Sequence, residues 1–326
     1  MLGSESWWPN SLGEMNCALP NLPVSRAFLV ALCLAVFLAN AQAAEPSVVG
    51  QPSGQILAAG DRRVIVLSQA GEVLWEYPTK LTHDAWMLQS GNVLFADGET
   101  VTEVTREKKV VFQYRAAEQK GGGTYACQRL ADGKTFVGEN STGRLLELDP
   151  DGKVVFALQT SPSRTGEHHN MRMARKLGNG NYLVCHSGAR LVKEYTPKGE
   201  AVWEVKVPGA VAFAAIRTPS GNTLVSCLDR VVEYDPNGKS IWECRAEELG
   251  AAVTVRNLTG INLLPNGNVV AGCYQAYADG QGCGLLEISR EKKVVWSYSK
   301  PKGDQTMMAV QLLSAEGKPS TGGVLR

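Results

Sequence analysis

The chain has 326 residues, of which 44% are hydrophobic and 20% charged, and its 33 basic residues nearly balance its 32 acidic ones. This composition is typical of a folded globular protein, and it excludes a disordered chain, a collagen-like repeat and a membrane protein with many spans. The formal charge of +1 also argues against a nucleic-acid partner, because binding to phosphates needs a clear surplus of Lys and Arg.

The first pattern along the chain predicts a targeting segment. Residues 27–39 form an apolar run that follows Arg26 and ends in the small-residue sequence ANAQAA. A positive flank, a short apolar core and small residues at its end are typical of a secretory signal peptide, and the run is too short to cross the ~30 Å hydrocarbon core of a bilayer as a helix. We therefore expect residues 1–44 to be removed, with translation starting at Met1 or Met15. Residues 45–326 would be exported to the periplasm or the cell exterior, without a membrane span.

Six cysteines follow the predicted cleavage site, and they are Cys127, Cys185, Cys227, Cys244, Cys273 and Cys283. An exported compartment permits disulfides, although a chain of this length does not need them to fold. Cys273 and Cys283 flank one short insertion, and we predict that these two form a disulfide. We expect the other four to be small buried hydrophobic residues.

An internal repeat decides the architecture. Six segments share an apolar stretch, a turn and a second stretch that carries an aromatic residue; they are residues 64–77, 101–114, 145–158, 192–205, 231–244 and 285–298. The aromatic residues are Trp75, Phe112, Phe156, Trp203, Trp242 and Trp296. β-Branched residues on both arms, with Asp-Gly, Asn-Gly or Lys-Gly at the bend, predict a β-hairpin.

A second hairpin precedes each of the last five segments, so each repeat holds four short strands in a meander of about 40–45 residues, which is the signature of a propeller blade. The first repeat lacks its opening strand, whereas residues 308–313 form a strand without a partner after the sixth repeat. Pairing these two ends in one blade predicts an all-β fold, a six-bladed β-propeller of four-stranded antiparallel blades that occupies residues 45–326 as a single domain.

The residues that recur from blade to blade are expected to have structural roles. The aromatic residues would pack between neighbouring blades. Nine residues before the last five of them stand glutamates, which are Glu103, Glu147, Glu194, Glu233 and Glu287. Polar groups within sheets are usually paired, and Arg144 and Arg230 lie three residues before Glu147 and Glu233 as their expected partners.

Residues that break the repeat are the candidates for function, and all four histidines are among them. We expect His83 to open the innermost strand of blade 2, His168 and His169 to open that of blade 4, and His186 to close the second strand of blade 4. In a four-stranded meander these positions share one face, opposite the Asn-Gly and Asp-Gly bends. We expect His83 and His169 to face each other across the mouth of the central channel, with His186 nearby.

This face gathers the predicted ligand-binding residues, which are His83, Asp84, Tyr125, Glu139, His168, His169, Arg172 and His186. Imidazoles near a carboxylate can bind a transition metal or act as acid and base, but the spacing matches no metal motif, and the metal is left open. A histidine nucleophile assisted by Arg172 would suit transfer of an anionic group, which makes His83, His169, His186 and Arg172 the catalytic candidates. The alternative is that these histidines only hydrogen-bond to the backbone where strands begin.

The units LLPNGNVVAG, RVVEYDPNGKSIWE and HDAWMLQSGNVLFAD resemble bacterial secreted propellers of the PQQ-binding-like, or quinoprotein-like, repeat family. The likeness covers nearly all of residues 53–313 and implies the propeller fold. Quinoprotein dehydrogenases of that superfamily usually have eight blades and adjacent disulfide-bonded cysteines, both of which this sequence lacks, so PQQ is not expected as a cofactor. The repeats are also similar to those of bacterial arylsulfotransferases, and that likeness implies His83, His169, His186 and Arg172 as candidates for sulfate transfer.

The sequence therefore favours an exported propeller that binds an unidentified small molecule or protein through its histidine-bearing face. The alternative is a periplasmic enzyme, either of the arylsulfotransferase type with histidine-mediated group transfer or a propeller lyase or hydrolase. We expect a monomer, and the cofactor is left open.

Overall fold

The computed structural model describes residues 47–60, 62–249, 253–274, 283–299, 306–320, 323 and 325–326. All of them belong to the second of the two units into which the chain divides, residues 44–326. The predicted signal peptide, residues 1–44, lies outside the described residues, as does most of the insertion between Cys273 and Cys283. Among the described residues, no helix combines the length and the apolar character that a membrane span needs.

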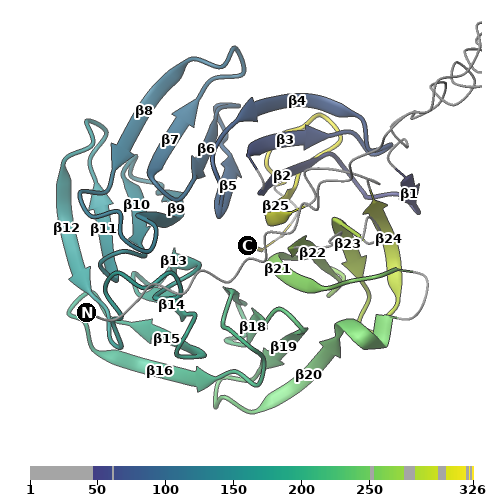
Figure 1. Cartoon of the computed structure of the whole chain (residues 1–326). Helices are drawn as coiled ribbons and strands as arrows, with labels where there is room; N and C mark the ends of the chain where they lie inside the picture. Colours follow the sequence, from purple (N-terminus) through teal and green to yellow (C-terminus); the bar gives the residue numbers. More distant parts are fainter. Residues whose placement is uncertain are drawn as a thin grey trace, which may run out of the picture. The chain divides into compact units, whose positions relative to one another are not determined.

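Six antiparallel sheets follow one another around a central channel (Figure 1) and form a six-bladed β-propeller, as predicted. Blade 2 contains β5 (Asp84–Met87), β6 (Val93–Ala96), β7 (Thr100–Val104) and β8 (Val110–Arg115). Blade 3 contains β9 (Thr124–Arg129), β10 (Thr135–Glu139), β11 (Arg144–Leu148) and β12 (Val154–Gln159). Blade 4 contains β13 (Ala174–Lys176), β14 (Tyr182–His186), β15 (Leu191–Tyr195) and β16 (Ala201–Lys206).

Blade 5 contains β17 (Ala214–Arg217), β18 (Thr223–Ser226), β19 (Arg230–Tyr234) and β20 (Ser240–Arg245), and the short 3-10 helix η2 (Ala246–Leu249) follows it. Blade 6 contains β21 (Asn257–Leu263), β22 (Val269–Tyr274), β23 (Leu285–Ile288) and β24 (Val294–Ser299), with β1 (Ser47–Val49) at its outer edge. Blade 1 contains β25 (Met307–Leu312), β2 (Ile56–Gly60), β3 (Arg63–Leu67) and β4 (Val73–Pro78).

The ring closes in blade 1, where two distant parts of the sequence form one sheet. Strand β25 pairs antiparallel with β2, with Leu312 opposite Ile56 and Ala309 opposite Ala59. This confirms the predicted pairing of the two ends. The fifth strand of blade 6 was not predicted: Val48 of β1 pairs with Tyr298 of β24, and a three-residue strand outside any hairpin leaves no recognisable pattern in the sequence.

Each repeated glutamate and the aromatic residue nine positions later lie opposite each other on two paired strands. Glu194 on β15 lies opposite Trp203 on β16, and Glu233 on β19 lies opposite Trp242 on β20. The register shifts immediately after each such glutamate, which marks a β-bulge. The repeat in the sequence therefore records one local geometry, because a bulge fixes both the register and the twist of the outer hairpin.

Four of the five repeated glutamates, Glu103, Glu147, Glu194 and Glu233, bind a basic residue of the next blade, and their partners differ from the prediction. Glu194 accepts hydrogen bonds from Asn181 of its own blade at 2.7 Å and from Arg217 of the next blade at 2.7 Å. The predicted pairing of Arg144 with Glu147 and of Arg230 with Glu233 is wrong. Arg144 binds Glu139, and Arg230 binds Asp229 and Glu243. Arg144 and Arg230 lie at the opposite end of the strand from the glutamate three positions later. The carboxylates of Glu147 and Glu233 instead bind Lys176 and Arg290 of the adjacent blade.

The repeated aromatic residues contact the next blade, as predicted. The indole Nε1 of Trp75 donates a hydrogen bond to the carbonyl of Arg106 at 2.8 Å, and that of Trp242 donates to the carbonyl of Arg290 at 2.9 Å. The guanidinium of Arg290 also lies 4.3 Å from the ring centroid of Trp242. Each blade is therefore tied to its successor by polar contacts as well as by apolar packing.

All six cysteines of the described residues are buried thiols. The side chains of Cys273 and Cys283 are close enough to form a hydrogen bond. This hydrogen bond, followed by burial, holds the pKa of Cys273 well above its usual value. The disulfide between them stays a prediction.

Burial of the closure strand should contribute to stability, and paired valine substitutions test this. Val310 on β25 is 1% exposed and packs in the core of blades 6 and 1, whereas Val154 on β12 is 43% exposed. We expect Val310→Ala to lower the free energy of unfolding by about 2 kcal/mol because it leaves a cavity. Val154→Ala should change it by less than about 0.5 kcal/mol. Equilibrium denaturation measures both, and equal effects would contradict this role of the closure strand.

The neighbouring thiols lead to a second prediction. In protein prepared without reductant, peptide mass spectrometry after alkylation under denaturing conditions should find Cys273 linked to Cys283. Cys127 and Cys185 should be alkylated, because each is surrounded by apolar core residues. Alkylation of both Cys273 and Cys283 in oxidised protein would count against the disulfide.

Candidate functional site

A cavity of about 290 Å³ opens at the mouth of the central channel. Its lining combines polar residues with apolar ones; the polar residues are His83, His168, His169, Arg172 and Tyr274, and the apolar ones include Val211, Phe213, Leu228 and Met308. These residues come from the inner strands, from segments next to them or from the ends of second strands, in blades 1, 2, 4, 5 and 6. The meander therefore brings residues far apart in sequence to one place, on the face opposite the Asn-Gly bends.

Arg172 is the central charge of this cavity. It is 6% exposed, and its guanidinium lies 4.8 Å from the ring centroid of Tyr125 and 5.8 Å from that of Phe213. Its Nη1 donates a hydrogen bond to the carbonyl of His168 at 3.1 Å. No carboxylate among the described residues forms an ion pair with it, and burial lowers its pKa.

The hydrogen bonds around Arg172 fix the protonation of His168. Arginine only donates, so the Nε2 of His168, 2.9 Å from Nη2 of Arg172, must be an unprotonated acceptor. Its Nδ1 then carries the proton and donates to the hydroxyl of Tyr125 at 2.7 Å, which in turn donates to the carbonyl of Gly121 at 3.0 Å. Burial and the charge of Arg172 lower the pKa of His168 to about 4, in agreement with this neutral tautomer.

Tyr125 is positioned by a glycine. Gly122 has φ +97°, in the left-handed region, and a Cβ at this position would lie 2.3 Å from the hydroxyl oxygen of Tyr125. The close approach of the backbone therefore depends on the missing side chain.

His169 and His83 are further polar residues of the lining. His169 is exposed, and its Nδ1 lies 3.3 Å from Nη2 of Arg172; burial and then Arg172 lower its pKa. His83 is buried, with its ring centroid 3.7 Å from that of Tyr125. Burial holds its pKa well below the usual value, and its Nδ1 has no hydrogen-bond partner among the described residues. The cavity therefore contains one fixed cation surrounded by neutral imidazoles.

Three other predicted residues, Asp84, Glu139 and His186, form their contacts outside the cavity. Asp84 is fully buried and binds Arg175 and Arg326. Glu139 is also buried and accepts hydrogen bonds from Tyr114 at 2.7 Å and from Arg144 at 2.8 Å.

His186 does not line the cavity either. Its Nε2 lies 2.7 Å from the hydroxyl of Tyr195, which donates to the carbonyl of Ser161. His186 is therefore buried against Tyr195 rather than part of the cavity lining, and its expected position near His83 and His169 stays a prediction.

Sequence reasoning missed Phe213, which is one of the apolar lining residues. It lies in the run VAFAAI before β17, where nothing distinguishes a wall residue from an ordinary inner-strand residue.

The described residues contain no group of three or more His, Cys, Asp or Glu side chains arranged to hold a metal ion. Two imidazole nitrogens of the cavity also face the guanidinium of Arg172. The arrangement is better suited to an anion, which Arg172 can bind through charge and through directed N–H groups.

Comparisons with known proteins show the fold and no family. No protein-family model matches the chain, and no curated protein matches it. A structure of a protein of unknown function from Bacteroides caccae is similar, with 22% identity and a TM-score of 0.68 over 80% of this chain and 98% of that chain. A catalytically inactive His-to-Ala variant of virginiamycin B lyase from Staphylococcus aureus, with quinupristin, has 10% identity and a TM-score of 0.53 over 78% and 88%.

The WD40 propeller domain of Doa1 has 14% identity and a TM-score of 0.55 over 86% of this chain and 90% of that chain. At these identities the likeness shows a β-propeller. The resemblance to quinoprotein-like and arylsulfotransferase propellers stays a prediction.

The buried histidine outside the cavity gives stability a pH dependence. Burial lowers the pKa of His186 from 6.5 to about 4. Between these values the unfolded chain binds the proton and the folded chain does not, so the free energy of unfolding falls as the pH falls. The loss for this fully buried group is at most about 3 kcal/mol between about pH 7 and pH 4.

The variant His186→Gln keeps an N–H group for Tyr195 but does not titrate. Denaturation at both pH values should therefore show a smaller pH dependence for His186→Gln than for wild type, whereas His169→Gln, an exposed control, should change it less. An unchanged pH dependence in His186→Gln would show that this side chain does not titrate as described.

Proposed function

We propose that this chain is an exported propeller that binds a small anionic ligand at the mouth of its channel. The observation that supports this most directly is Arg172, a buried guanidinium without a carboxylate partner among the described residues. Buried charges are usually paired, because removing an ion from water costs several kcal/mol. Among the described residues, Arg172 contacts two imidazoles, one carbonyl, two aromatic rings and the hydroxyl of Tyr125. None of these groups is a carboxylate, so an anion would supply the missing charge.

The volume and the lining of the cavity indicate the size and the chemical character of the rest of the ligand. Its volume of about 290 Å³ lies at the lower end of the range for small-molecule sites. The apolar lining residues, which include Phe213 and Met308, favour an apolar or aromatic body beside the anionic group. We infer a carboxylate, sulfate or phosphate carried on a small hydrophobic group.

A second candidate function is catalysis by one of the histidines. His168 and His169 are neutral and exposed beside a fixed cation. The lone pair of His168 accepts a hydrogen bond from Arg172, whereas the contact of His169 with Arg172 is longer, at 3.3 Å. His169 is therefore the better candidate: once its Nδ1 turns away from the guanidinium, it can accept a proton or attack an anionic group while the arginine binds the charge. Histidine-mediated sulfate transfer or a lyase reaction would both use this arrangement. Virginiamycin B lyase, a propeller whose His-to-Ala variant is inactive, makes the lyase reaction worth testing.

Binding of simple aromatic anions tests the first candidate. Isothermal titration with benzoate and 4-nitrophenyl sulfate should detect binding, and the neutral analogue benzamide should bind more weakly. Arg172→Leu should lower the affinity for the anions by about 10-fold or more, because a charge-assisted hydrogen bond contributes roughly 1.5–3 kcal/mol.

Arg164→Leu is the matched control, since Arg164 lies in the same segment but is exposed and paired with Glu167. Arg172→Lys, which keeps the charge without the planar fork, should be intermediate and serves if the leucine variant does not fold. The proposal would be overturned if both wild type and Arg172→Lys bound the anions no more tightly than they bind benzamide, with the same affinity in the two proteins.

A turnover assay with the same protein distinguishes binding from catalysis. Release of 4-nitrophenol from 4-nitrophenyl sulfate, lost in His168→Ala or His169→Ala but retained in His186→Gln, would establish the second candidate. Binding without turnover would leave the ligand-binding function as the account of this site.

A further inference from the structure

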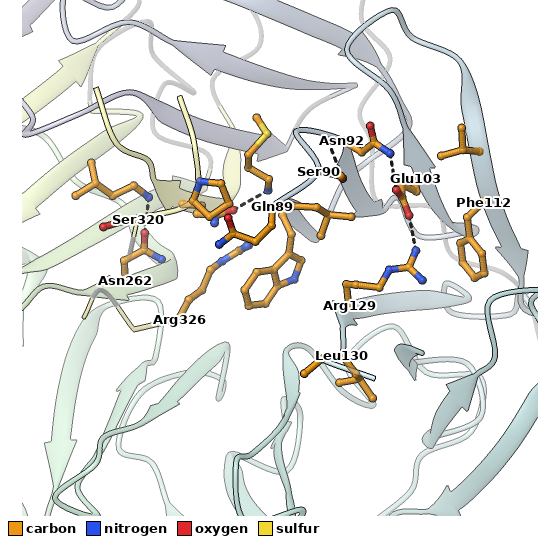
Figure 2. A pocket seen from close by; sticks show the side chains of 18 of the residues that line it. Gln89, Ser90, Asn92, Glu103, Phe112, Arg129, Leu130, Asn262, Ser320 and Arg326 are labelled. Carbon is orange, nitrogen blue, oxygen red and sulfur yellow. Dashed lines mark hydrogen bonds and ion pairs between the residues drawn. The ribbon is translucent and has the colours of Figure 1, made fainter. Parts of the chain in front are cut away.

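The opposite end of the channel contains a larger groove, of about 1030 Å³, which runs beside blades 2 and 3. Figure 2 shows Glu103 and Arg129, which form an ion pair, on one side of the groove, Asn262 and Ser320 on the other, and Arg326 between them. Trp86, Leu88 and other apolar residues form much of the wall between them. The groove lies on the face of the Asn-Gly bends and is separate from the cavity around Arg172.

Arg326 is the unexpected occupant of this end. Its side chain is 5% exposed, and its Nη2 donates to Oδ1 of Asp84 at 2.8 Å. Its guanidinium lies 4.2 Å from the ring centroid of Trp86. A carboxylate together with an indole face is a favourable receptor for a guanidinium, because it combines charge, directed hydrogen bonds and stacking.

This receptor is complete without Arg326. Asp84 accepts two hydrogen bonds from Arg175, at 2.7 and 3.1 Å, and a third from the backbone N–H of Cys127 at 3.1 Å. Arg175 and Cys127 therefore hold the carboxylate in place, and the positions of Asp84 and of β5 do not require a second cation. Trp86 is held independently, since its Nε1 donates to the carbonyl of Cys127 at 2.5 Å.

Arg326 itself is bound incompletely. Its Nε and Nη1 are buried and have no hydrogen-bond partner among the described residues, and burial lowers its pKa to about 10. Its neighbour Leu325 is attached by two backbone hydrogen bonds to Leu263 of β21, both of 2.9 Å. Among the described residues, this segment is held by the pairing and packing of Leu325 and by the contacts of Arg326 with Asp84 and Trp86. A segment with so few contacts can open locally below the cost of global unfolding.

We propose that Asp84 and Trp86 form a binding site for an arginine side chain, that Arg326 fills it from within the chain, and that an arginine of a partner peptide can replace Arg326. The groove beside the site provides room for the rest of such a peptide. The polar groups of the groove, which are the Glu103–Arg129 pair and Gln89, can contact the backbone or the charged side chains of the peptide. This site takes a cationic ligand and does not depend on the anion site.

Removal of the internal occupant tests the proposal. Arg326→Ala should bind L-arginine amide at least about 10-fold more tightly than wild type, measured by titration of tryptophan fluorescence, because Trp86 lies in the site and Arg326 no longer competes. L-Lysine amide carries the same charge without the planar fork and is the ligand control. Equal binding of both amides to Arg326→Ala would show a cavity that accepts any cation. Equal affinity of wild type and variant for arginine amide would also overturn the proposal.

Exchange in the unmodified protein provides the second measurement, which remains decisive if Arg326→Ala does not fold. Arginine amide at high concentration should displace Arg326 and so speed hydrogen exchange at the amides of Leu263 and Leu325, which hydrogen-bond to each other. Lysine amide should leave both rates unchanged, and so should benzoate, which we assign to the other end of the channel. No change in either amide with arginine amide would mean that Arg326 is a fixed structural residue and that the site accepts no external ligand.

Discussion

The pairing of β25 with β2 is the constraint on which the rest of the structure depends. This contact between residues 307–312 and 56–60 makes the sixth blade a neighbour of the first and turns a row of hairpins into a ring. The outer hairpins are tied from blade to blade by the repeated glutamates and aromatic residues, but those contacts act only between adjacent blades. Closure is what brings blade 2 and blade 4 around one channel, so that His83 and His168 come within 6.4 Å of each other by their ring centroids.

The chemistry of the channel follows from a surplus of positive charge within it. Arg175 and Arg326 share Asp84, and Arg172 has no carboxylate partner among the described residues. Burial of a cation raises its free energy, and in each case the fold compensates with aromatic faces, for Arg172 those of Tyr125 and Phe213. A cation held in this way is ready for an anion at one end of the channel. At the other end a carboxylate and an indole form the opposite kind of site, for a cation.

The fold could be predicted from the sequence because each blade repeats a local geometry. The nine-residue spacing of Glu233 and Trp242 is a cross-strand pair beside a bulge, and local patterns of this kind can be recognised without tertiary knowledge. The site was predictable only in part: breaks in the repeat pointed to His83, His169 and Arg172. Asp84 and His186 look equivalent to them in sequence, but Asp84 is buried against Arg175, 91 residues away, and His186 is buried against the hydroxyl of Tyr195. Such partners have no local signature.

A crystal structure determined in the presence of selenate would test the central claim most directly, because selenium scatters anomalously and selenate resembles sulfate. The account predicts an anomalous peak within hydrogen-bonding distance of the guanidinium of Arg172, together with an unchanged contact between Arg326 and Asp84 at the far end of the channel. An empty mouth in which Arg172 pairs with a carboxylate of the chain itself would contradict it. In that case Arg172 would be an ordinary structural cation and the cavity would lack its ligand-binding charge.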